Sequence, residues 1–201
     1  GIAIGAEALN ITGTGVDGNA ALDNISGDNT FGGAITLAGN TTFRNQADSF
    51  KLTNTVNAGT YQLSLGGTSQ KGLISGVISG TGSITTRIIA TGGAWTLSGV
   101  NTYTGATQIQ SGDLIIANTE VINNSSNLNL NGGRFVTGRV SGNTETLDTL
   151  NLLASSSIVL AAGSHSVIFP VCSGITWTAG ATLTIYGWTG TEGSSGTGGK
   201  I

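Results

Sequence analysis

The 201-residue chain has little charge, one cysteine, one proline and no methionine. Charged residues make up 8% of it, whereas an average soluble domain carries about 25%. So little charge disfavours solvated helices, and the 34 glycines would interrupt any helix that began. Pro170, the single proline, is expected where no ladder N–H is needed, at the start of a strand or at a corner.

These scarcities also exclude several kinds of site. Cys172 cannot form a disulfide within the chain and has no Cys or His neighbour at metal-ligand spacing, so we interpret it as a small buried hydrophobe. The seven basic residues are scattered, and the net charge is −3, which argues against nucleic acid as a partner. No apolar run approaches the roughly 18 residues of a membrane-spanning helix.

The residues that are abundant favour short strands. Disordered chains combine low hydrophobicity with high net charge, whereas 38% of this chain is hydrophobic. Val, Ile, Leu and Thr occur throughout, and these residues suit strands. The sequence therefore predicts many short strands separated by glycine turns.

An internal repeat predicts how the strands are arranged. Sliding residues 25–43 by 72 positions superimposes them on the stretch that begins at Leu97, and Ile74-Ser75-Gly76-Val77 matches Leu97-Ser98-Gly99-Val100 at an offset of 23. The residues that match at the longer offset are Ser26, Gly27, Asn29, Thr30, Gly33 and Ala34, on Ser98, Gly99, Asn101, Thr102, Gly105 and Ala106. Fixed-period repetition of strand and turn units is the signature of a solenoid.

Glycines set the expected length of one coil. The glycines that precede alternating residues are Gly59, Gly82, Gly112, Gly133, Gly163 and Gly180, on average about 24 residues apart. We predict an all-β, right-handed parallel β-helix (β-solenoid) with roughly 20–30 residues per coil, so that the longer offset would be about three coils. Exposed turns are expected at 123–126 and 193–199.

The last part of the chain alternates with a period of two. We expect one parity to face inward and the other to face solvent. The inward set is Ile175, Trp177, Leu183 and Ile185, and the outward set is Thr176, Thr178, Thr182 and Thr184.

Two stretches resemble segments of known surface proteins. Leu97-Ser98-Gly99, Asn101-Thr102-Tyr103-Thr104-Gly105 and the residues Thr107, Ile109, Gly112 and Leu114 resemble the passenger-associated transport repeat of bacterial autotransporters. Residues 173–191 resemble a segment near the end of secreted repeat proteins, especially of Bacteroidetes, where it lies ahead of a C-terminal sorting region. The resemblances imply a parallel β-helix, export across the outer membrane and a surface location, and they imply no particular activity.

They also suggest a division of the chain. Residues 1–118 would form a β-solenoid with two transport repeats, at 25–43 and 97–116. Residues 119–201 would continue it, ahead of a sorting or anchoring region that this sequence does not contain. Because the chain opens at Gly1 without Met or a leader pattern, we expect it to be a fragment of something longer.

Catalytic and metal-binding motifs are sparse. His165 is the single histidine, and no Gly-x-Ser-x-Gly elbow accompanies it, so we expect a half-exposed histidine at a turn or strand end. Ten acidic residues, from Glu7 to Glu192, are spread singly, which disfavours the paired carboxylates of a carbohydrate-active enzyme. Residues 12–17 half-match a calcium-binding nonapeptide, but the next residues do not repeat it. We predict no catalytic, metal-binding or cofactor-binding residues.

Other motifs have a structural and a binding interpretation. Asn29 and Asn101 suit left-handed corners or amide ladders between coils, and we prefer that interpretation. The outward threonines could form an ice- or glycan-binding array, although threonine is also common on a solvated strand face. An exposed aromatic platform could stack on sugars, but packing in the core or at an end is favoured. Its members would be Trp95, Trp177, Trp188 and Tyr186.

We therefore predict a non-catalytic structural or adhesive β-helical segment of a large secreted bacterial surface protein. Roughly eight coils, stacked about 4.8 Å apart, would give a stiff rod of about 40 Å. The expected partners are the rest of the longer polypeptide, secretion machinery or outer-membrane components, surface glycans, and further copies in a fibre. A carbohydrate-active β-helix enzyme fragment and a glycan- or ice-binding solenoid remain the alternatives.

Overall fold

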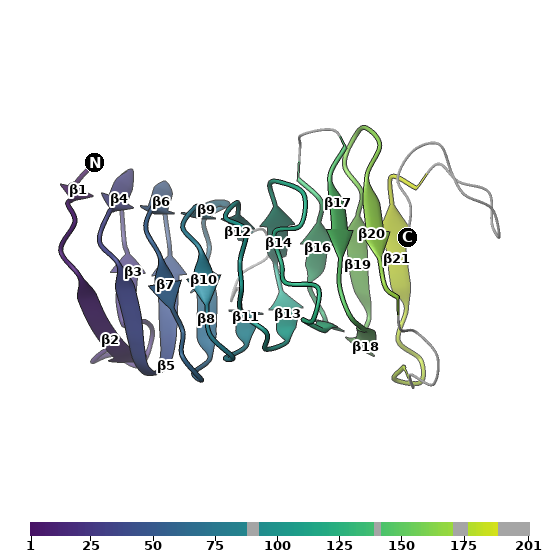
Figure 1. Cartoon of the computed structure of the whole chain (residues 1–201), viewed down its shortest axis with the longest axis horizontal. Helices are drawn as coiled ribbons and strands as arrows, with labels where there is room; N and C mark the ends of the chain where they lie inside the picture. The colour runs from purple at the N-terminus through teal and green to yellow at the C-terminus, as the bar shows by residue number, and fades with distance from the viewer. Residues whose placement is uncertain (88–92, 139–141, 171–176, 189–201) are drawn as a thin grey trace.

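The computed structural model describes residues 1–87, 93–138, 142–170 and 177–188. This part of the chain is an all-β parallel solenoid with no helix, as predicted, and its windings stack along one long axis (Figure 1). No helix in the described ranges is long and apolar enough to span a bilayer. The predicted right-handed winding stays a prediction.

One sheet runs the whole length of the solenoid, and we call it sheet A. It has nine parallel strands, and each is one winding further along the chain than the previous one. In order they are β1 (Ala3–Ile4), β4 (Asn29–Phe31), β6 (Ser49–Leu52), β9 (Lys71–Ile74), β12 (Ala94–Leu97), β14 (Asp113–Ile116), β16 (Arg134–Val136), β19 (Ser156–Val159) and β21 (Leu183–Tyr186).

The second sheet, which we call sheet B, has ten strands. Its long strand β5 (Ile35–Asn45) pairs with β7 through its first residues and with β8 through its last, so a winding can contribute two segments to this sheet. The other strands are β2 (Leu9–Gly13), β3 (Leu22–Asn24), β7 (Val56–Asn57), β8 (Leu63–Gly67), β10 (Ile78–Ser79), β11 (Ile84–Arg87), β13 (Thr107–Ser111), β15 (Leu128–Asn131) and β18 (Leu150–Ala154). A separate pair consists of β17 (Thr144–Thr146) and β20 (Ser166–Ile168).

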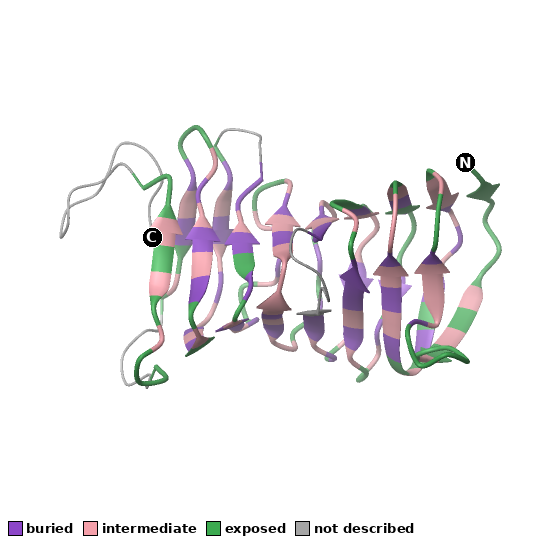
Figure 2. Cartoon of the chain, turned by 180° about the vertical axis from the view of Figure 1, so that it is seen from behind, coloured by how far each residue is buried: buried purple, intermediate pink, exposed green. Residues whose placement is uncertain are grey.

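The core is a set of apolar rows that run along the solenoid. Alternate residues of most strands are buried, and they form the purple bands inside the stacked strands in Figure 2. One row on sheet A consists of Phe31, Leu52, Ile74, Leu97 and Ile116, each directly above the next. Each winding therefore buries its apolar face against its two neighbours.

Winding lengths fit the sequence prediction. On sheet A the shortest step between stacked positions runs from Thr96 to Ile115, and the two longest, which are equal, run from Ala3 to Thr30 and from Ser156 to Leu183. The average step is close to the predicted period, and the variation is absorbed in the corners and loops between strands.

The ring of Trp95 occupies the space that a side chain at Gly72 would otherwise fill. Trp95 is completely buried, and its ring lies against Gly72 of the previous winding, where an added Cβ would lie 2.6 Å from Trp95 Cδ2. The ring makes an edge-to-face contact with Phe50, two windings away, at 6.3 Å between centroids. Its Nε1–H donates to the Gly66 carbonyl at 2.9 Å. The core position of Trp95 is thus confirmed.

The longer repeat offset in the sequence does not correspond to three windings. Thr30 lies above Lys51, then Leu73, and then Thr96, so three windings lead from Thr30 to Thr96 and not to Thr102. The predicted superposition of Thr30 on Thr102 is therefore wrong as a structural register. Ser26 and Gly27 precede a strand of sheet A, whereas residues 98–99 follow one, because the same turn residues serve at different corners.

The last winding differs from the predicted parity in one respect. In β21, Leu183 and Ile185 pack against the core while Thr182 and Thr184 are exposed, as expected. Trp177, predicted to face inward, is 45% exposed, and its indole donates to the Leu150 carbonyl at 3.3 Å. A residue of the end winding has no further described winding over it, so parity alone does not bury it. Ile175, Thr176, Cys172 and residues 193–199 lie outside the described residues.

Turn residues match the prediction in part. Gly112 precedes β14 with φ of 66°, which favours glycine. Gly82 has no room for a side chain, because a Cβ would lie 1.7 Å from the Tyr61 carbonyl oxygen of the previous winding. Pro170 lies just after β20, consistent with a corner. The predicted exposed turn at 123–126 is wrong at Ser126, which is fully buried.

Candidate functional site

The most distinctive polar site surrounds Asn101, at the corner that follows β12. Its Oδ1 accepts a hydrogen bond from the Ile78 N–H at 2.7 Å, and its Nδ2 donates to the Val121 carbonyl at 2.8 Å. The amide therefore joins the backbones of the windings on both sides. Because these groups are buried, leaving either without a partner would cost free energy.

The predicted left-handed corners at Asn29 and Asn101 are wrong. Among described residues other than glycine, a positive φ occurs only at Asp48 and Glu120. Both amides do bond between windings, since Asn29 Oδ1 accepts the Ile2 N–H at 2.7 Å and Asn101 Oδ1 accepts the Ile78 N–H. Ladders in which one side-chain amide bonds to another occur at other positions. Asn24 donates to Asn45, and Asn151 donates to Asn129, each at 2.8 Å. Asn29 joins the first of these pairs, since its Nδ2 donates to Asn24 Oδ1 at 2.6 Å.

A chain of buried hydroxyls continues from the corner. Tyr103 Oη lies 2.7 Å from Thr107 Oγ1, which lies 3.1 Å from Ser126 Oγ of the next winding. The Ser126 hydroxyl donates to the Gly105 carbonyl at 2.7 Å. Burial raises the pKa of Tyr103, so its hydroxyl stays neutral. The three hydroxyl-bearing residues are buried, and the bonds to Ser126 hold two windings together.

Glu145, in β17, is a second buried polar group and was missed by the sequence analysis. Its side chain is fully buried, Oε2 accepts the Val121 N–H at 2.8 Å and Oε1 accepts the Ile122 N–H at 2.6 Å. The two carboxyl oxygens thus supply the acceptors that a neighbouring strand would otherwise provide for the backbone N–H groups of residues 121–122. Burial raises the pKa of Glu145 to about 8, although the two N–H bonds act in the opposite direction.

The winding also brings a second carboxylate close to it. Glu120 contributes to the raised pKa of Glu145, and its Oε1 accepts a hydrogen bond from the Thr146 hydroxyl at 3.0 Å. The expectation that the acids are spread singly is therefore wrong here, because Glu120 and Glu145 lie in adjacent windings. Both oxygens of Glu145 are engaged by backbone N–H groups inside the solenoid, so the pair offers no open position for a substrate.

His165 lies just before β20, as expected for a strand end, but it is buried and not half-exposed. Its Nε2 is 3.4 Å from the Ala162 carbonyl oxygen, and its Nδ1 has no hydrogen-bond partner within the described part of the chain. The histidine packs in the core among the last windings.

In the segment that half-matches a calcium-binding nonapeptide, residues 12–17, the acidic side chain bonds within its own turn. Both oxygens of Asp17 accept hydrogen bonds from Asn19, and these bonds lower its pKa. Arg44 pairs with Asp23 and approaches Asp17 at 3.9 Å. Within the described ranges, no three His, Cys, Asp or Glu side chains are grouped in a way that could hold a metal ion.

The threonine and aromatic candidates are not assembled into one array. Thr184 lies on the outer side of β21, Thr178 and Thr182 are exposed before it, and Thr176 is outside the described residues. Trp95 is in the core. The remaining aromatics are exposed near the end of the described chain, by 45% for Trp177, 54% for Tyr186 and 41% for Trp188.

Comparison with protein families connects the Asn101 corner to a known motif. Residues 92–116 match the family model described as Passenger-associated-transport-repeat. The resemblance found in the sequence is thereby confirmed for this segment. Comparisons with curated proteins and with solved structures found no significant match.

The transport repeat corresponds to one closed winding of the solenoid. It includes β12 of sheet A, the corner at Asn101, β13 of sheet B, and β14 back on sheet A. Its glycines allow close approach to the previous winding, since a Cβ on Gly99 would lie 2.6 Å from the Gly76 carbonyl oxygen. A Cβ on Gly105 would lie 2.3 Å from the Gly82 carbonyl oxygen. Within the transport repeat, the side chains of Asn101 and Thr107 also bond to neighbouring windings.

Proposed function

We propose that the chain is a non-catalytic passenger segment of an autotransporter-like protein, secreted or displayed at the bacterial surface as a rod. The single observation that carries this proposal is the transport repeat at 92–116, seated as one winding of a continuous solenoid. The family name ties such repeats to exported passengers, and a stacked parallel solenoid suits an extended spacer.

The buried polar side chains of the transport repeat support a mechanical role. Asn101, Tyr103 and Thr107 are buried. Tyr103 bonds to Thr107 within its own winding, and Asn101 and Thr107 bond to neighbouring windings. Glu145 does the same in the winding after next. Side chains committed to holding backbone in place cannot also bind a substrate, so the repeat contributes stiffness and register.

A carbohydrate-active enzyme is the main alternative. It would need two reachable carboxylates about 5–10 Å apart in a cleft. The adjacent carboxylates of Glu120 and Glu145 do not meet this need, because Glu145 is enclosed. We expect incubation with neutral and acidic polysaccharides to release no reducing ends or unsaturated products, and release of either would contradict a non-catalytic role.

Surface display tests the proposal directly. The chain would be placed between an export signal and the outer-membrane barrel of a characterised autotransporter, and its exposure on intact cells measured by antibody binding and external protease. We expect efficient display of a folded rod. Retention of the wild-type chain inside the cell, with the barrel inserted, would contradict the proposal.

A deletion of part of one winding provides the control. Removing residues 97–106 shortens the transport repeat by a non-integral fraction of a turn and puts the following strands out of register. We expect lower display and faster proteolysis of this variant. Equal display of both would show that the barrel exports any attached chain, and it would remove the support for a passenger role.

A further inference from the structure

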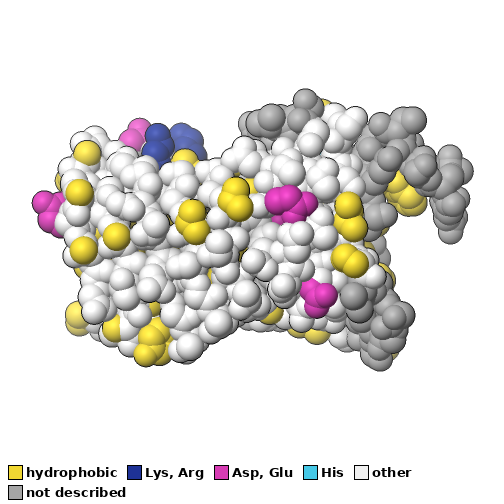
Figure 3. Space-filling view, in the orientation of Figure 1, with side chains coloured by type: hydrophobic (Ala, Val, Ile, Leu, Met, Phe, Trp, Pro, Cys, Tyr) yellow, Lys and Arg dark blue, Asp and Glu magenta, His cyan; other side chains and the backbone are white. Residues whose placement is uncertain are grey.

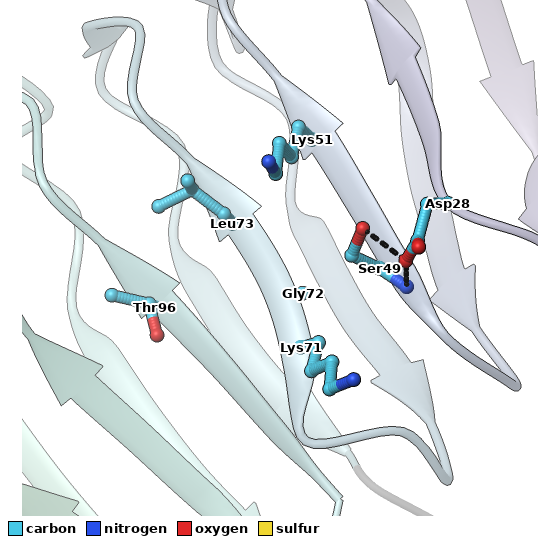
Figure 4. A pocket seen from close by; sticks show the side chains of 7 residues that line it. All are labelled: Asp28, Ser49, Lys51, Lys71, Gly72, Leu73 and Thr96. Carbon is cyan, nitrogen blue, oxygen red and sulfur yellow. Dashed lines mark hydrogen bonds between the residues drawn. The ribbon is translucent and has the colours of Figure 1, made fainter. Parts of the chain in front are cut away.

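The outer face of sheet A carries a shallow hollow that none of the motifs above explains. It has a volume of about 510 Å³ and lies over β6, β9 and β12, in the first half of the solenoid (Figure 4). Its lining residues are Asp28, Ser49, Lys51, Lys71, Gly72, Leu73 and Thr96.

Two lysines from neighbouring windings flank this hollow. Lys51 lies beside Leu73 in the ladder between β6 and β9, so Lys71, two positions earlier, is its diagonal neighbour. In Figure 4 the two side chains stand on either side of Gly72. Both are exposed. Figure 3 shows a dark-blue patch of basic side chains at the upper edge of the molecule, with an acidic side chain directly beside it.

These lysines differ from Arg44 and Arg134, both of which form ion pairs. Arg44 pairs with Asp23, and Arg134 pairs with Asp113 at 2.6 Å. Neither Lys51 nor Lys71 has a carboxylate within ion-pair distance in the described part of the chain. On a chain with a net charge of −3, these two lysines lie close together without a close ion pair, and Lys71 acts on Asp28 only at longer range.

Asp28 lies at the rim of the same hollow and is already engaged. Its Oδ1 accepts hydrogen bonds from the Ser49 hydroxyl at 2.6 Å and from the Ser49 N–H at 2.9 Å, as the dashed lines in Figure 4 indicate. These bonds lower its pKa. The hollow therefore contains two positive charges and one fixed negative charge.

We propose that this hollow binds an acidic polysaccharide through its anionic groups. Lys51 and Lys71 would contact carboxylate or sulfate groups, and the hydroxyls of Ser49 and Thr96 can hydrogen-bond to sugar hydroxyls. Leu73, which lies between Lys51 and Thr96 in the ladder, offers an apolar surface for the C–H face of a sugar ring. The site is open along the sheet, which suits a segment of a polymer more than an enclosed small ligand.

The number of charges distinguishes this ligand from nucleic acid. A duplex presents one negative charge per about 1.7 Å, and its binders neutralise many phosphates at once. Two lysines suit a polymer that carries one charge per sugar. The binding itself does not require the passenger role, and only the encounter with an extracellular polymer depends on the proposed function.

Binding of defined oligogalacturonates to the whole chain, measured by titration calorimetry at low and at physiological salt, tests the proposal. We expect measurable binding that weakens as salt rises, and no binding of neutral maltodextrins of equal length. Replacing both lysines, Lys51→Gln with Lys71→Gln, should lower the affinity about tenfold. Circular dichroism would verify that the variant keeps its strand content.

Two further variants separate the hollow from net charge. Thr178→Glu with Thr184→Glu changes the net charge by the same amount at the far end of the solenoid, and it should leave the affinity nearly unchanged. Asp28→Asn removes the negative charge while its amide oxygen can still accept from Ser49, and it should raise the affinity about two- to threefold.

Several results would overturn the proposal. These are no binding of oligogalacturonate by the wild-type chain at low salt, equal losses in the lysine and threonine variants, and equal binding of neutral maltodextrins. Binding to phosphatidylglycerol vesicles without binding to the oligosaccharide would also overturn it, in favour of a membrane surface. Because display on cells is measured separately, failure of this test and failure of the passenger role are distinguishable.

Discussion

At the scale of single residues, Glu145 makes the stability of the solenoid depend on pH. Burial raises its pKa to about 8 from an ordinary value of 4.5, so the folded chain holds this proton more tightly than the unfolded chain does. The free energy of unfolding should therefore fall as pH rises from about 4.5 to about 8, and should change little above that. One pKa unit corresponds to about 1.4 kcal/mol, so the effect amounts to a few kcal/mol.

Urea denaturation at a series of pH values between 5 and 9 measures this slope. In Glu145→Gln the side chain is neutral at every pH, as the protonated carboxyl is, so we expect no slope from this position. Glu120→Gln is the matched control and should move the upper end of this pH range to lower pH, because it removes a like charge that raises the pKa of Glu145. A slope of wild-type size in Glu145→Gln would contradict the assignment.

Gly72 illustrates a residue that is required for packing and not for its backbone conformation. In Gly72→Ala the new Cβ would meet the buried ring of Trp95 at 2.6 Å, so we expect a loss of about 1–3 kcal/mol, measured by the urea midpoint. Gly5→Ala, where the nearest atom is a flexible glutamate oxygen at 3.4 Å, should cost little. Adding Trp95→Leu to Gly72→Ala should recover part of the loss, and strict additivity would contradict the steric explanation.

At the scale of elements, the Asn101 corner holds three windings. Asn101→Ala leaves the Ile78 N–H without its buried acceptor, while the Val121 carbonyl keeps the backbone N–H of residue 101, so we expect a loss of about 1–3 kcal/mol. Hydrogen exchange should accelerate at the Ile78 amide more than at other core amides. Asn118→Ala is the control, because Asn118 also bonds to the previous winding, at the Ser98 carbonyl, but is exposed. Equal losses in both variants would contradict the role of burial.

Much of the element pattern could be predicted from the sequence, because strand parity and glycine spacing are local signals. The inward parity of Leu183 and Ile185 agrees with the stacked structure, and so does the match of Ile74 with Leu97. Windings of unequal length hid the register elsewhere, so the likeness between residues 25–43 and 97–116 gave a wrong superposition.

The sites were harder to predict, because they depend on which residues the windings place next to each other. Glu145 has no neighbour in sequence that marks it as buried, and its partners Val121 and Ile122 belong to the previous winding. Lys51 and Lys71 were seen as two of several scattered basic residues. They lie diagonally on adjacent strands only because that winding places Leu73, and not one of its neighbours, beside Lys51.

At the scale of the whole molecule, each winding packs only against its neighbours, so the solenoid should tolerate the deletion of a whole winding but not of part of one. Removing residues 73–95, one complete winding between Leu73 and Thr96, joins Gly72 to Thr96 and keeps the inward and outward parity of sheet A. Val56 then takes the place of Ile78 below Asn101, since the two are in register. We expect a folded chain, shorter by about 4.8 Å in small-angle scattering.

Removing residues 73–83 instead leaves a fraction of a winding and reverses that parity, so we expect loss of strand content by circular dichroism. Equal folding of both variants would mean that the windings do not stack in the register described.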